Sequence, residues 1–506
     1  MLIGVPAESR TPLVAATPAS VTALRRLGHD VLIAAGAGER AGFTDADYAE
    51  AGARVVDDGG AWRTDLVLKV DPPNAAELGR LAPGTRLAAQ LAPGRSPALL
   101  EELAARDLTA LALDAVPRIS RAQSLDVLSS MANLAGYRAV VEAASAYGGM
   151  LGGQVTAAGK VPPARVFVVG AGVAGLAAIG TAQSLGAQVR AFDVRPEVAE
   201  QVASMGATNV SLDIATGSDR SDGYAGELTG AAEAAAAEMY AREAAAADIV
   251  ITTALIPGRP APRLIDAETV ARMRPGSVVV DLAAANGGNV AGTVAGEQVI
   301  TDNGVTILGW TDLPARLPRQ ASTLYATNLV NLIKLLTPDR DGRLVVDETD
   351  DVQRGMLVAD KGAVTWPPPP IAVSAAPAPA PVTAEPAAPR PRGPSRAITL
   401  GLVAILGIVA AIQLEWVLGD NLVIFALAVL LGYYVISRVT HALHTPLMSI
   451  TNAVSGMILV GAMLEVGDSD PLVAGLSMVG IFLASINVFG GFFVTRRMLA
   501  MFRRSE

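Results

Sequence analysis

A segment built from alanine and proline divides the chain into two regions that must fold separately. Residues 371–396 read IAVSAAPAPAPVTAEPAAPRPRGPSR. This composition has too little apolar volume for a core and favours a semi-rigid, extended linker over a structured arm. We therefore expect one folded region before the linker and another after it. The total of 506 residues is also too long for a single hydrophobic core.

The region after the linker has the pattern of a membrane domain. Four apolar stretches lie at 397–414, 421–437, 448–465 and 472–494. Each is close to the roughly 20 residues that a helix needs to cross a bilayer. A single stretch of this length could be a buried helix of a soluble protein. Four in succession, separated by polar turns, predict a transmembrane region with four helices over 397–500.

The charges that flank these stretches agree on one orientation. Basic residues lie before the first stretch, between the second and third, and after the fourth: Arg390, Arg392, Arg396, Arg438, Arg496, Arg497, Arg503 and Arg504. The two other turns carry only acidic residues. Because positively charged loops stay on the cytoplasmic side, both termini and the N-terminal region are expected there. The protein is predicted to lie in a bacterial cytoplasmic membrane.

The N-terminal region alternates short apolar runs with helical patterns. The expected strands within 1–140 are LIGVP, DVLIAAG, LVLKV, RLAAQLA and LTALALD, and the expected helices are PASVTALRRLG and SPALLEELAARD. A second unit of the same kind begins at RVFVVGAGVAG and extends to about Trp310, and NLVNLIKLL follows as a helix. This alternation predicts an α/β fold with two Rossmann-like, parallel-sheet subdomains.

The segment GAGVAG at 170–175 is a G-x-G-x-x-G motif formed by Gly170, Gly172 and Gly175. It follows a strand, opens a helix and precedes a second strand that ends in Asp193, which is the full dinucleotide-binding pattern. The glycines let the backbone approach a pyrophosphate at the helix N-terminus. Asp193 is expected to accept the ribose hydroxyls and to favour NAD over NADP. Arg195 leaves the alternative open, because an arginine here can hold a 2′-phosphate.

Composition narrows the possible chemistry. The chain has no cysteine, so disulfides and thiolate metal sites are excluded. Its net charge of −9 argues against general nucleic-acid binding. His441 and His444 are spaced as i and i+3 without a nearby carboxylate, so we expect an interfacial or capping role and no metal site.

The sequence resembles the alpha subunits of the proton-translocating NAD(P) transhydrogenases, in their two-subunit bacterial form. The segments that carry the resemblance are RISRAQSLD, GAGVAGL, SDGYA, ITTALIPGRPAP, DLAAANGGN, GWTDLPARLPRQASTLYATNLVNL, VTWPPPP and HALHTPLMSITNAVSG. It covers essentially the whole chain except the linker. It implies an alanine-dehydrogenase-like subdomain of 1–140 plus about 320–370, and an NAD-binding subdomain of 141–320.

The resemblance implies that NADH gives its hydride to NADP⁺ while a proton crosses the membrane. NAD(H) would bind this chain, and NADP(H) would bind a beta subunit. The sequence agrees with this implication, since it contains no second G-x-G-x-x-G motif and therefore cannot supply both nucleotide sites. The family also implies an assembly of two alpha and two beta chains, with self-associating soluble domains.

The resemblance further implies a set of nucleotide-contacting residues. These are Gln123, Ser124, Leu125, Asp126, Val173, Asp193, Val194, Arg195, Gly223 and Leu255. Arg118, Gln123, Asp126 and Ser129 resemble the polar loop of the family, and Tyr224 resembles the aromatic residue of its mobile loop, here within 211–230.

Hydride transfer between two nicotinamides needs no general acid or base, but it needs the rings at about 3–3.5 Å with aligned faces. Gln123 and Asp126 can hold the carboxamide, Ser129 can add a hydrogen bond, and Arg118 can neutralise the pyrophosphate or orient the ring. Arg121 could serve in its place. The alternative is a loop tied to its own backbone that caps a helix.

Two other functions compete with this interpretation. A membrane-anchored, alanine-dehydrogenase-like oxidoreductase would share Lys69 but would need a histidine and an aspartate as acid and base. The matching positions here are Gln90 and Ala285. A membrane-anchored NAD sensor would need no NADP-binding partner.

Overall fold

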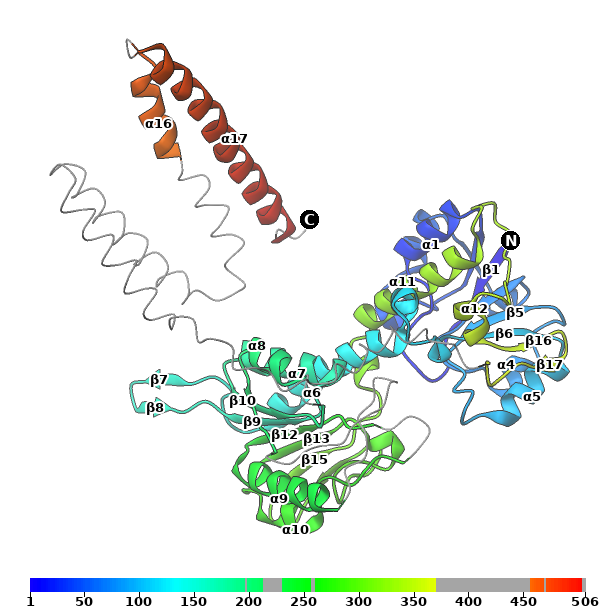
Figure 1. Cartoon of the computed structure of the whole chain (residues 1–506). Helices are drawn as coiled ribbons and strands as arrows, with labels where there is room; N and C mark the ends of the chain where they lie inside the picture. The colour runs from blue at the N-terminus through cyan, green and yellow to red at the C-terminus, as the bar shows by residue number, and fades with distance from the viewer. Residues whose placement is uncertain (196–197, 213–229, 256–259, 370–455, 468–469, 503–506) are drawn as a thin grey trace, which may run out of the picture. The chain divides into compact units, whose positions relative to one another are not determined.

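The computed structural model describes residues 1–195, 198–212, 230–255, 260–369, 456–467 and 470–502 (Figure 1). The chain divides into two compact units, Met1–Ser374 and Ala375–Glu506, and each is described by itself. The first unit contains two α/β lobes. The first lobe is built around an eight-stranded sheet and the second around a seven-stranded sheet.

The sheet of the first lobe has the order β17-β16-β6-β5-β4-β1-β2-β3. Its strands are β1 Leu2–Val5, β2 Asp30–Ala34, β3 Arg54–Val56, β4 Leu66–Leu68, β5 Arg86–Ala89, β6 Thr109–Ala112, β16 Leu357–Asp360 and β17 Ala363–Val364. The strands β1 to β6 are parallel, whereas β16 and β17 are antiparallel. The five strands predicted here are present, and the sequence did not reveal β3, β16 or β17.

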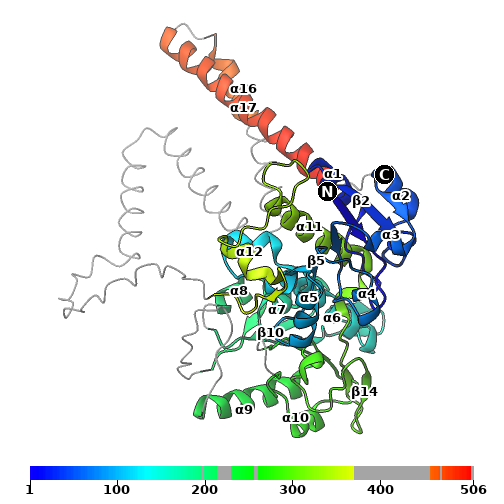
Figure 2. The same ribbon diagram turned by 90° about the vertical axis from the view of Figure 1, so that its right-hand side faces the viewer.

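Short helices connect these strands. They are α1 Pro18–Arg26, α2 Asp45–Glu50, α3 Asp58–Trp62, α4 Ala75–Leu78 and α5 Pro97–Ala105, followed late in the chain by α11 Pro318–Leu336 and α12 Asp351–Met356. The predicted helices PASVTALRRLG and SPALLEELAARD correspond to α1 and α5. Thr17 caps α1 by accepting the Ser20 N–H, and Pro18 occupies the first helical position, where no N–H is needed. Helix α11 lies beside α1 (Figure 2), so the two ends of the N-terminal unit share one core.

The second sheet has the order β11-β10-β9-β12-β13-β15-β14, and only β14 is antiparallel to its neighbour. Its strands are β9 Arg165–Val169, β10 Gln188–Phe192, β11 Thr208–Asn209, β12 Ile249–Thr252, β13 Val278–Asp281, β14 Gln298–Ile300 and β15 Thr306–Leu308. Its helices are α6 Val127–Ala146, α7 Val173–Ser184, α8 Val198–Ser204, α9 Ala231–Ala246 and α10 Ala267–Arg272. A hairpin of β7 Gln154–Thr156 and β8 Gly159–Val161 projects from this lobe (Figure 1).

Both faces of the central strands of the second sheet are covered, which explains the continuous apolar runs of β9, β12 and β13. Val166 and Val168 of β9 pack with α6 and α7, whereas Phe167 and Val169 pack with α9 and α10. Figure 1 shows these two pairs of helices on opposite sides of the sheet. Successive residues of a strand point to opposite faces, so a strand buried on both sides must be apolar throughout.

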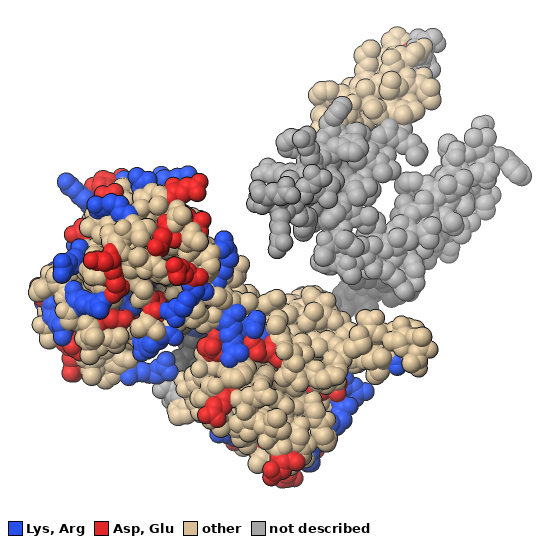
Figure 3. All heavy atoms as spheres, turned by 180° about the vertical axis from the view of Figure 1, so that it is seen from behind, with Lys and Arg blue, Asp and Glu red and all other residues tan. Residues whose placement is uncertain are grey.

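Charged side chains of both signs are interspersed over the face of the first lobe that Figure 3 shows. They do not gather there into one basic area. The visible face of the second lobe carries fewer charged side chains, and uncharged residues form much of it.

The described part of the second unit consists of α16 Gly456–Glu465 and α17 Pro471–Phe502. The two helices approach closely, because a Cβ built on Gly480 would lie 3.6 Å from the Ala462 Cβ. The apolar stretches 397–414 and 421–437 lie outside the described residues. Within the described residues, no helix combines the length and the apolarity that a membrane crossing requires.

Candidate nucleotide-binding site

The second sheet has the strand order of a doubly wound nucleotide-binding fold. The chain runs outward from β9 through β10 to β11, then returns to the other side of β9 with β12, β13 and β15. The direction of winding therefore reverses between β9 and β12, and ligands of such sheets bind at the carboxyl ends of the strands at this point. Val169 is in register with Phe192 and with Thr252, so the loops after β9, β10 and β12 begin side by side.

Each of the three glycines in the loop after β9 is needed for a different structural reason. Gly170 has φ +91°, a conformation that residues with a Cβ rarely adopt. A Cβ on Gly175 would lie 1.9 Å from the Gly170 oxygen, so this glycine lets α7 pack against the strand. A Cβ on Gly172 would meet no described atom within 4 Å. Gly172 therefore lies next to open space at the N-terminus of α7, where a pyrophosphate can approach the backbone.

Asp193 directly follows β10 and is held by four hydrogen bonds. Its Oδ2 accepts the Ala171 N–H at 2.7 Å and the Arg195 Nη2 at 2.9 Å. Its Oδ1 accepts the Arg195 backbone N–H at 3.0 Å and the Arg195 Nε at 2.9 Å. Burial opposes ionisation of this carboxyl, but the hydrogen bonds and charge of Arg195, together with the Ala171 N–H, lower its pKa. Asp193 is therefore a carboxylate, as a ribose acceptor must be.

Three apolar residues predicted as contacts lie around this loop. Val173 opens α7 and Leu255 follows β12, and both side chains are more than 40% exposed. Large apolar side chains with this exposure, next to a glycine loop, can cover a ligand. Val194 is half-buried and packs against the core under α9. Thr253, which the sequence did not single out, joins the two central loops by donating to the Gly170 oxygen at 3.1 Å.

The polar loop leaves the carboxyl edge of the first sheet. After β6 come two 3-10 helices, η2 Leu113–Ala115 and η3 Ser120–Leu125, and then α6. Asp126 caps α6, since its Oδ1 accepts the Ser129 N–H at 2.9 Å and its Oδ2 accepts the Ser129 hydroxyl at 2.5 Å. The capping alternative considered above is therefore present in the structure. Arg118 and Gln123 are exposed, and Arg121 pairs with Asp350 at 2.6 Å.

The main chain of the polar loop is anchored from α11. Asn328 and Asn331 each donate a side-chain N–H to the Ser124 oxygen, at 2.9 and 3.0 Å. Leu125 is buried in the same core. These contacts hold the segment 123–126 while the Gln123 side chain stays exposed. The i, i+3 spacing of the two asparagines on a predicted helix was the one signal by which the sequence could have indicated them.

Helix α6 connects the polar loop with the glycine loop. Its Gly136 packs against α7, because a Cβ there would lie 2.0 Å from the Ala174 oxygen. Val127 begins the helix nine residues earlier, which corresponds to about 13 Å along its axis. Helix α6 therefore joins the two regions that were predicted to contact the dinucleotide.

The loops after β5 and β13 also meet at this side of the unit. Arg95 donates to the Asn286 Oδ1 at 2.9 Å, which joins the first lobe to the 3-10 helix η4 Ala284–Asn286. Gln90 follows β5 and Ala285 lies in η4. Neither residue can act as a general acid or base. Within the described part of the chain there is also no group of acidic and histidine side chains that could hold a metal.

The equivalent reversal point of the first sheet, between β1 and β4, is filled by the chain's own charges. Lys69 follows β4 and pairs with Glu8 at 2.9 Å and with Glu77 at 3.6 Å. Glu8 also accepts the Val70 N–H at 2.6 Å. Lys69 and Glu8 are almost completely buried. This point of the first lobe therefore holds an ion cluster in place of a glycine loop.

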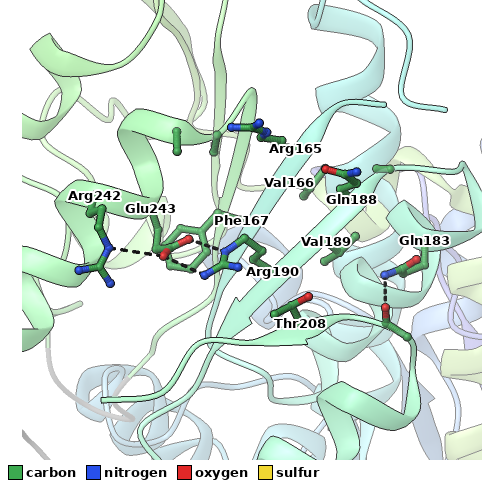
Figure 4. Close-up of a pocket in the computed structure, with 14 residues that line it drawn as sticks. Arg165, Val166, Phe167, Gln183, Gln188, Val189, Arg190, Thr208, Arg242 and Glu243 are labelled. Carbon is green, nitrogen blue, oxygen red and sulfur yellow. Dashed lines mark hydrogen bonds and ion pairs between the residues drawn. The ribbon is translucent and has the colours of Figure 1, made fainter. Parts of the chain in front are cut away.

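A cavity lies at the opposite edge of the second sheet. It has a volume of about 650 Å³ and is lined at the amino ends of β9 and β10 by residues that include Arg165, Gln188 and Arg190. Figure 4 shows Arg190 from β10 pointing toward Glu243 of α9. The glycine loop and Asp193 lie at the carboxyl ends of the same strands. This cavity is therefore separate from the predicted nucleotide site.

Gly223 and Tyr224 lie outside the described residues, as does most of the segment 211–230. The remaining features define a class: a dinucleotide-binding protein with two Rossmann-like lobes and one complete glycine-loop site.

Comparison with known proteins specifies this class further. Residues 4–135 and 139–367 match the family models described as alanine dehydrogenase/PNT, N-terminal and C-terminal domain. Residues 421–504 match the model of the 4TM region of pyridine nucleotide transhydrogenase. The NAD(P) transhydrogenase subunit alpha of Haemophilus influenzae is 49% identical over 100% of both chains. The chain belongs to the family of NAD(P) transhydrogenase alpha subunits.

A solved structure agrees with this assignment. The crystal structure of transhydrogenase from Sinorhizobium meliloti is 42% identical, with a TM-score of 0.66, and the match covers 72% of this chain and 100% of that one. The alternative is more distant: alanine dehydrogenase of Mycobacterium tuberculosis is 33% identical over 70% of this chain and 92% of its own.

Proposed function

We propose that this chain binds NAD(H) at the carboxyl edge of its second sheet and passes hydride from NADH directly to NADP⁺ held on a beta subunit. The transfer is coupled to proton translocation across the membrane. The observation that carries the proposal is one complete glycine-loop site in a chain that has no second such motif. A reaction between two dinucleotides then requires a second polypeptide.

The residues around the site suit positioning better than proton transfer. Gln123 and Asp126 are proposed to hold the nicotinamide carboxamide, with Ser129 and Arg118 beside them. Arg118 is exposed and Gln123 extends from a segment that α11 fixes through Ser124. The glycine loop, Val173, Asp193, Val194, Arg195 and Leu255 are proposed to line the rest of the dinucleotide site. Gly223 and Tyr224 are proposed to complete the site.

A direct transfer requires that the reacting face of the nicotinamide stays open to the second coenzyme. It also requires that the site contain no general acid or base that could activate a small substrate to react with the NAD(H) in place of the second coenzyme. Gln90 and Ala285 fulfil this condition, because neither can exchange a proton at neutral pH. Oxidation of an amino acid would need such a group, so the alanine-dehydrogenase-like alternative is disfavoured.

The membrane part is proposed to span the cytoplasmic membrane of a bacterium with four helices. Both termini and the nucleotide-binding unit would then face the cytoplasm, as the arginine distribution favours. The partners would be the beta subunit and a second alpha subunit, in an assembly of two alpha and two beta chains. The titrating group of the proton pathway is expected on the beta subunit.

The test uses the full chain reconstituted in liposomes with its beta subunit. NADH that carries deuterium at the transferred position and NADP⁺ are added, and the label in NADPH is measured by mass spectrometry, together with the internal pH. The proposal predicts label in NADPH and a pH change that requires the beta subunit. Label in NADPH without the beta subunit would contradict it, as would NAD reduction with alanine alone.

A further inference from the structure

Asp193 and Arg195 form a bidentate ion pair at the place where the adenosine ribose of NAD(H) must bind. A carboxylate offers about four lone-pair positions to hydrogen-bond donors. Four donors already fill them here: the backbone N–H groups of Ala171 and Arg195, and the Nε and Nη2 atoms of the Arg195 guanidinium. The acceptor that the ribose needs is therefore occupied in this structure.

The two backbone donors belong to the loop itself and do not have to move. The two guanidinium donors come from one side chain, and that side chain is 24% exposed. Withdrawal of this single side chain would free two acceptor positions on Asp193. A ribose presents two hydroxyls, at the 2′ and 3′ positions, so the number of vacated positions matches the number of incoming donors.

We propose that Arg195 is a specificity-determining residue that competes with NAD(H): its guanidinium occupies the ribose acceptor of Asp193 and must withdraw before NAD(H) binds. The inference rests on the proposed binding of NAD(H) at this site. The free energy of NAD(H) binding then includes the exchange of the Arg195 hydrogen bonds to Asp193 for those of the ribose hydroxyls. Removal of the Arg195 bonds therefore strengthens NAD(H) binding.

The same pair determines how the site treats a 2′-phosphate. A phosphate next to the Asp193 carboxylate meets a like charge, which disfavours it. The Arg195 guanidinium could attract the phosphate, but it is held by that carboxylate in a bidentate pair. NADP(H) is rejected while both residues are present. Loss of the carboxylate alone would release Arg195 to accept the phosphate.

The alternative is an ordinary structural ion pair, and the same strand offers one for comparison. Arg190 of β10 binds Glu243 in a bidentate pair, with Nε–Oε2 at 2.6 Å and Nη2–Oε1 at 3.0 Å (Figure 4). It has the same chemistry as the Asp193–Arg195 pair. It lies toward the amino end of the sheet, away from the glycine loop. Arg190→Gln is therefore the matched control.

The test measures NADH and NADPH dissociation constants of the full-length chain in detergent by isothermal titration calorimetry. For Arg195→Gln, we expect NADH to bind about tenfold more tightly, since two charge-assisted hydrogen bonds no longer compete. Arg195→Lys keeps the charge but not the bidentate geometry, so its NADH affinity should lie between that of the unmodified chain and that of Arg195→Gln. Arg190→Gln should leave both affinities unchanged.

Asp193→Asn should weaken NADH binding at least about tenfold and strengthen NADPH binding. The double variant with Arg195→Gln should lose that gain for NADPH. If Asp193 and Arg195 formed only a structural ion pair, every variant of these two residues would bind NADH more weakly. Weaker NADH binding by folded Arg195→Gln or Arg195→Lys would therefore contradict the proposal. Failure of the unmodified chain to bind NADH would instead overturn the proposed function.

Discussion

The hydroxyl of Ser129 lies 2.5 Å from Oδ2 of Asp126, and the backbone N–H of Ser129 lies 2.9 Å from Oδ1 of the same residue. One carboxylate therefore caps α6 and also binds the side chain that the resemblance places beside it in the nicotinamide site. Each oxygen accepts one of these bonds, so each keeps room for another donor. Asp126 can hold a carboxamide N–H without releasing the helix.

Asp126→Asn is predicted to lower turnover strongly and to leave NADH affinity within about tenfold, or roughly 1.4 kcal/mol. Asparagine is as good an N-cap as aspartate, so the free energy of unfolding should change little. Asp126→Ala should lower turnover and also cost about 1 kcal/mol of stability. Gln123→Asn should lower turnover like Asp126→Asn. Hydride transfer is measured in the reconstituted complex, and normal turnover in Asp126→Asn or Gln123→Asn would refute a positioning role.

Gly172→Ala and Gly175→Ala are predicted to differ in their effect on folding stability. The added Cβ at Gly175 would lie 1.9 Å from the Gly170 oxygen, so we expect a loss of about 1–3 kcal/mol of stability through overpacking. At Gly172 no described atom lies within 4 Å, so stability should stay within about 0.5 kcal/mol. NADH affinity should still fall at least about tenfold, because the methyl occupies the space of the pyrophosphate. Thermal denaturation and NADH titration separate the two cases.

Lys69→Met is predicted to cost about 3–5 kcal/mol, because Glu8 and Glu77 would remain buried without their cation. Lys361 is the control, since it also pairs with two carboxylates, Glu348 and Asp360, but is 79% exposed. Lys361→Met should change stability far less than Lys69→Met, because an exposed ion pair is screened by solvent and contributes little. Equal losses in chemical denaturation would contradict a stabilising role for the buried cluster.

The Lys69→Met deficit should also depend on pH. Burial raises the pKa of Glu8, and Lys69 acts against this effect. Without Lys69 the pKa of Glu8 in the folded state should rise further above its value in the unfolded chain. A carboxyl with this shift binds its proton more tightly when folded, so the stability it contributes is present at low pH and is lost as pH rises through the folded-state pKa. The deficit should therefore shrink from pH 8 to pH 5, measured as the free energy of unfolding.

NADH binding by Arg195→Gln should become sensitive to acid. Burial raises the pKa of Asp193, and in the unmodified chain the bonds from Arg195 and the loop outweigh it. Without the guanidinium, the pKa of this carboxyl should rise, and a protonated Asp193 loses an acceptor for the ribose. NADH affinity of the variant should fall between pH 7 and pH 5, while that of the unmodified chain stays flat. Parallel pH profiles would argue against this account.

Much of the fold could be predicted because it depends on local patterns. The runs that became β1, β2, β4, β5, β6, β9, β12 and β13 are mainly apolar and bounded by turn residues, as doubly covered strands require. Strand β10 carries two exposed polar residues and was predicted from its place between the glycine motif and Asp193. The glycine loop and Asp193 were also evident from spacing alone. The strands β3, β7, β8, β11, β14, β15, β16 and β17 were not predicted, because two to four residues are too few to show a period. Strand β16 also pairs with β6, a partner far away in the chain.

The sequence by itself predicted the division of the chain, the parallel α/β class and the position of the glycine loop, and its resemblance to a family supplied the residues proposed to contact a dinucleotide. Only the tertiary structure decided which partners those residues bind. It pairs Arg195 with Asp193, makes Asp126 a helix cap, and fills the reversal point of the first sheet with Glu8, Lys69 and Glu77. The reason is physical: hydrogen bonds and ion pairs depend on distances of about 3 Å, and those arise only when strands remote in sequence are brought into register.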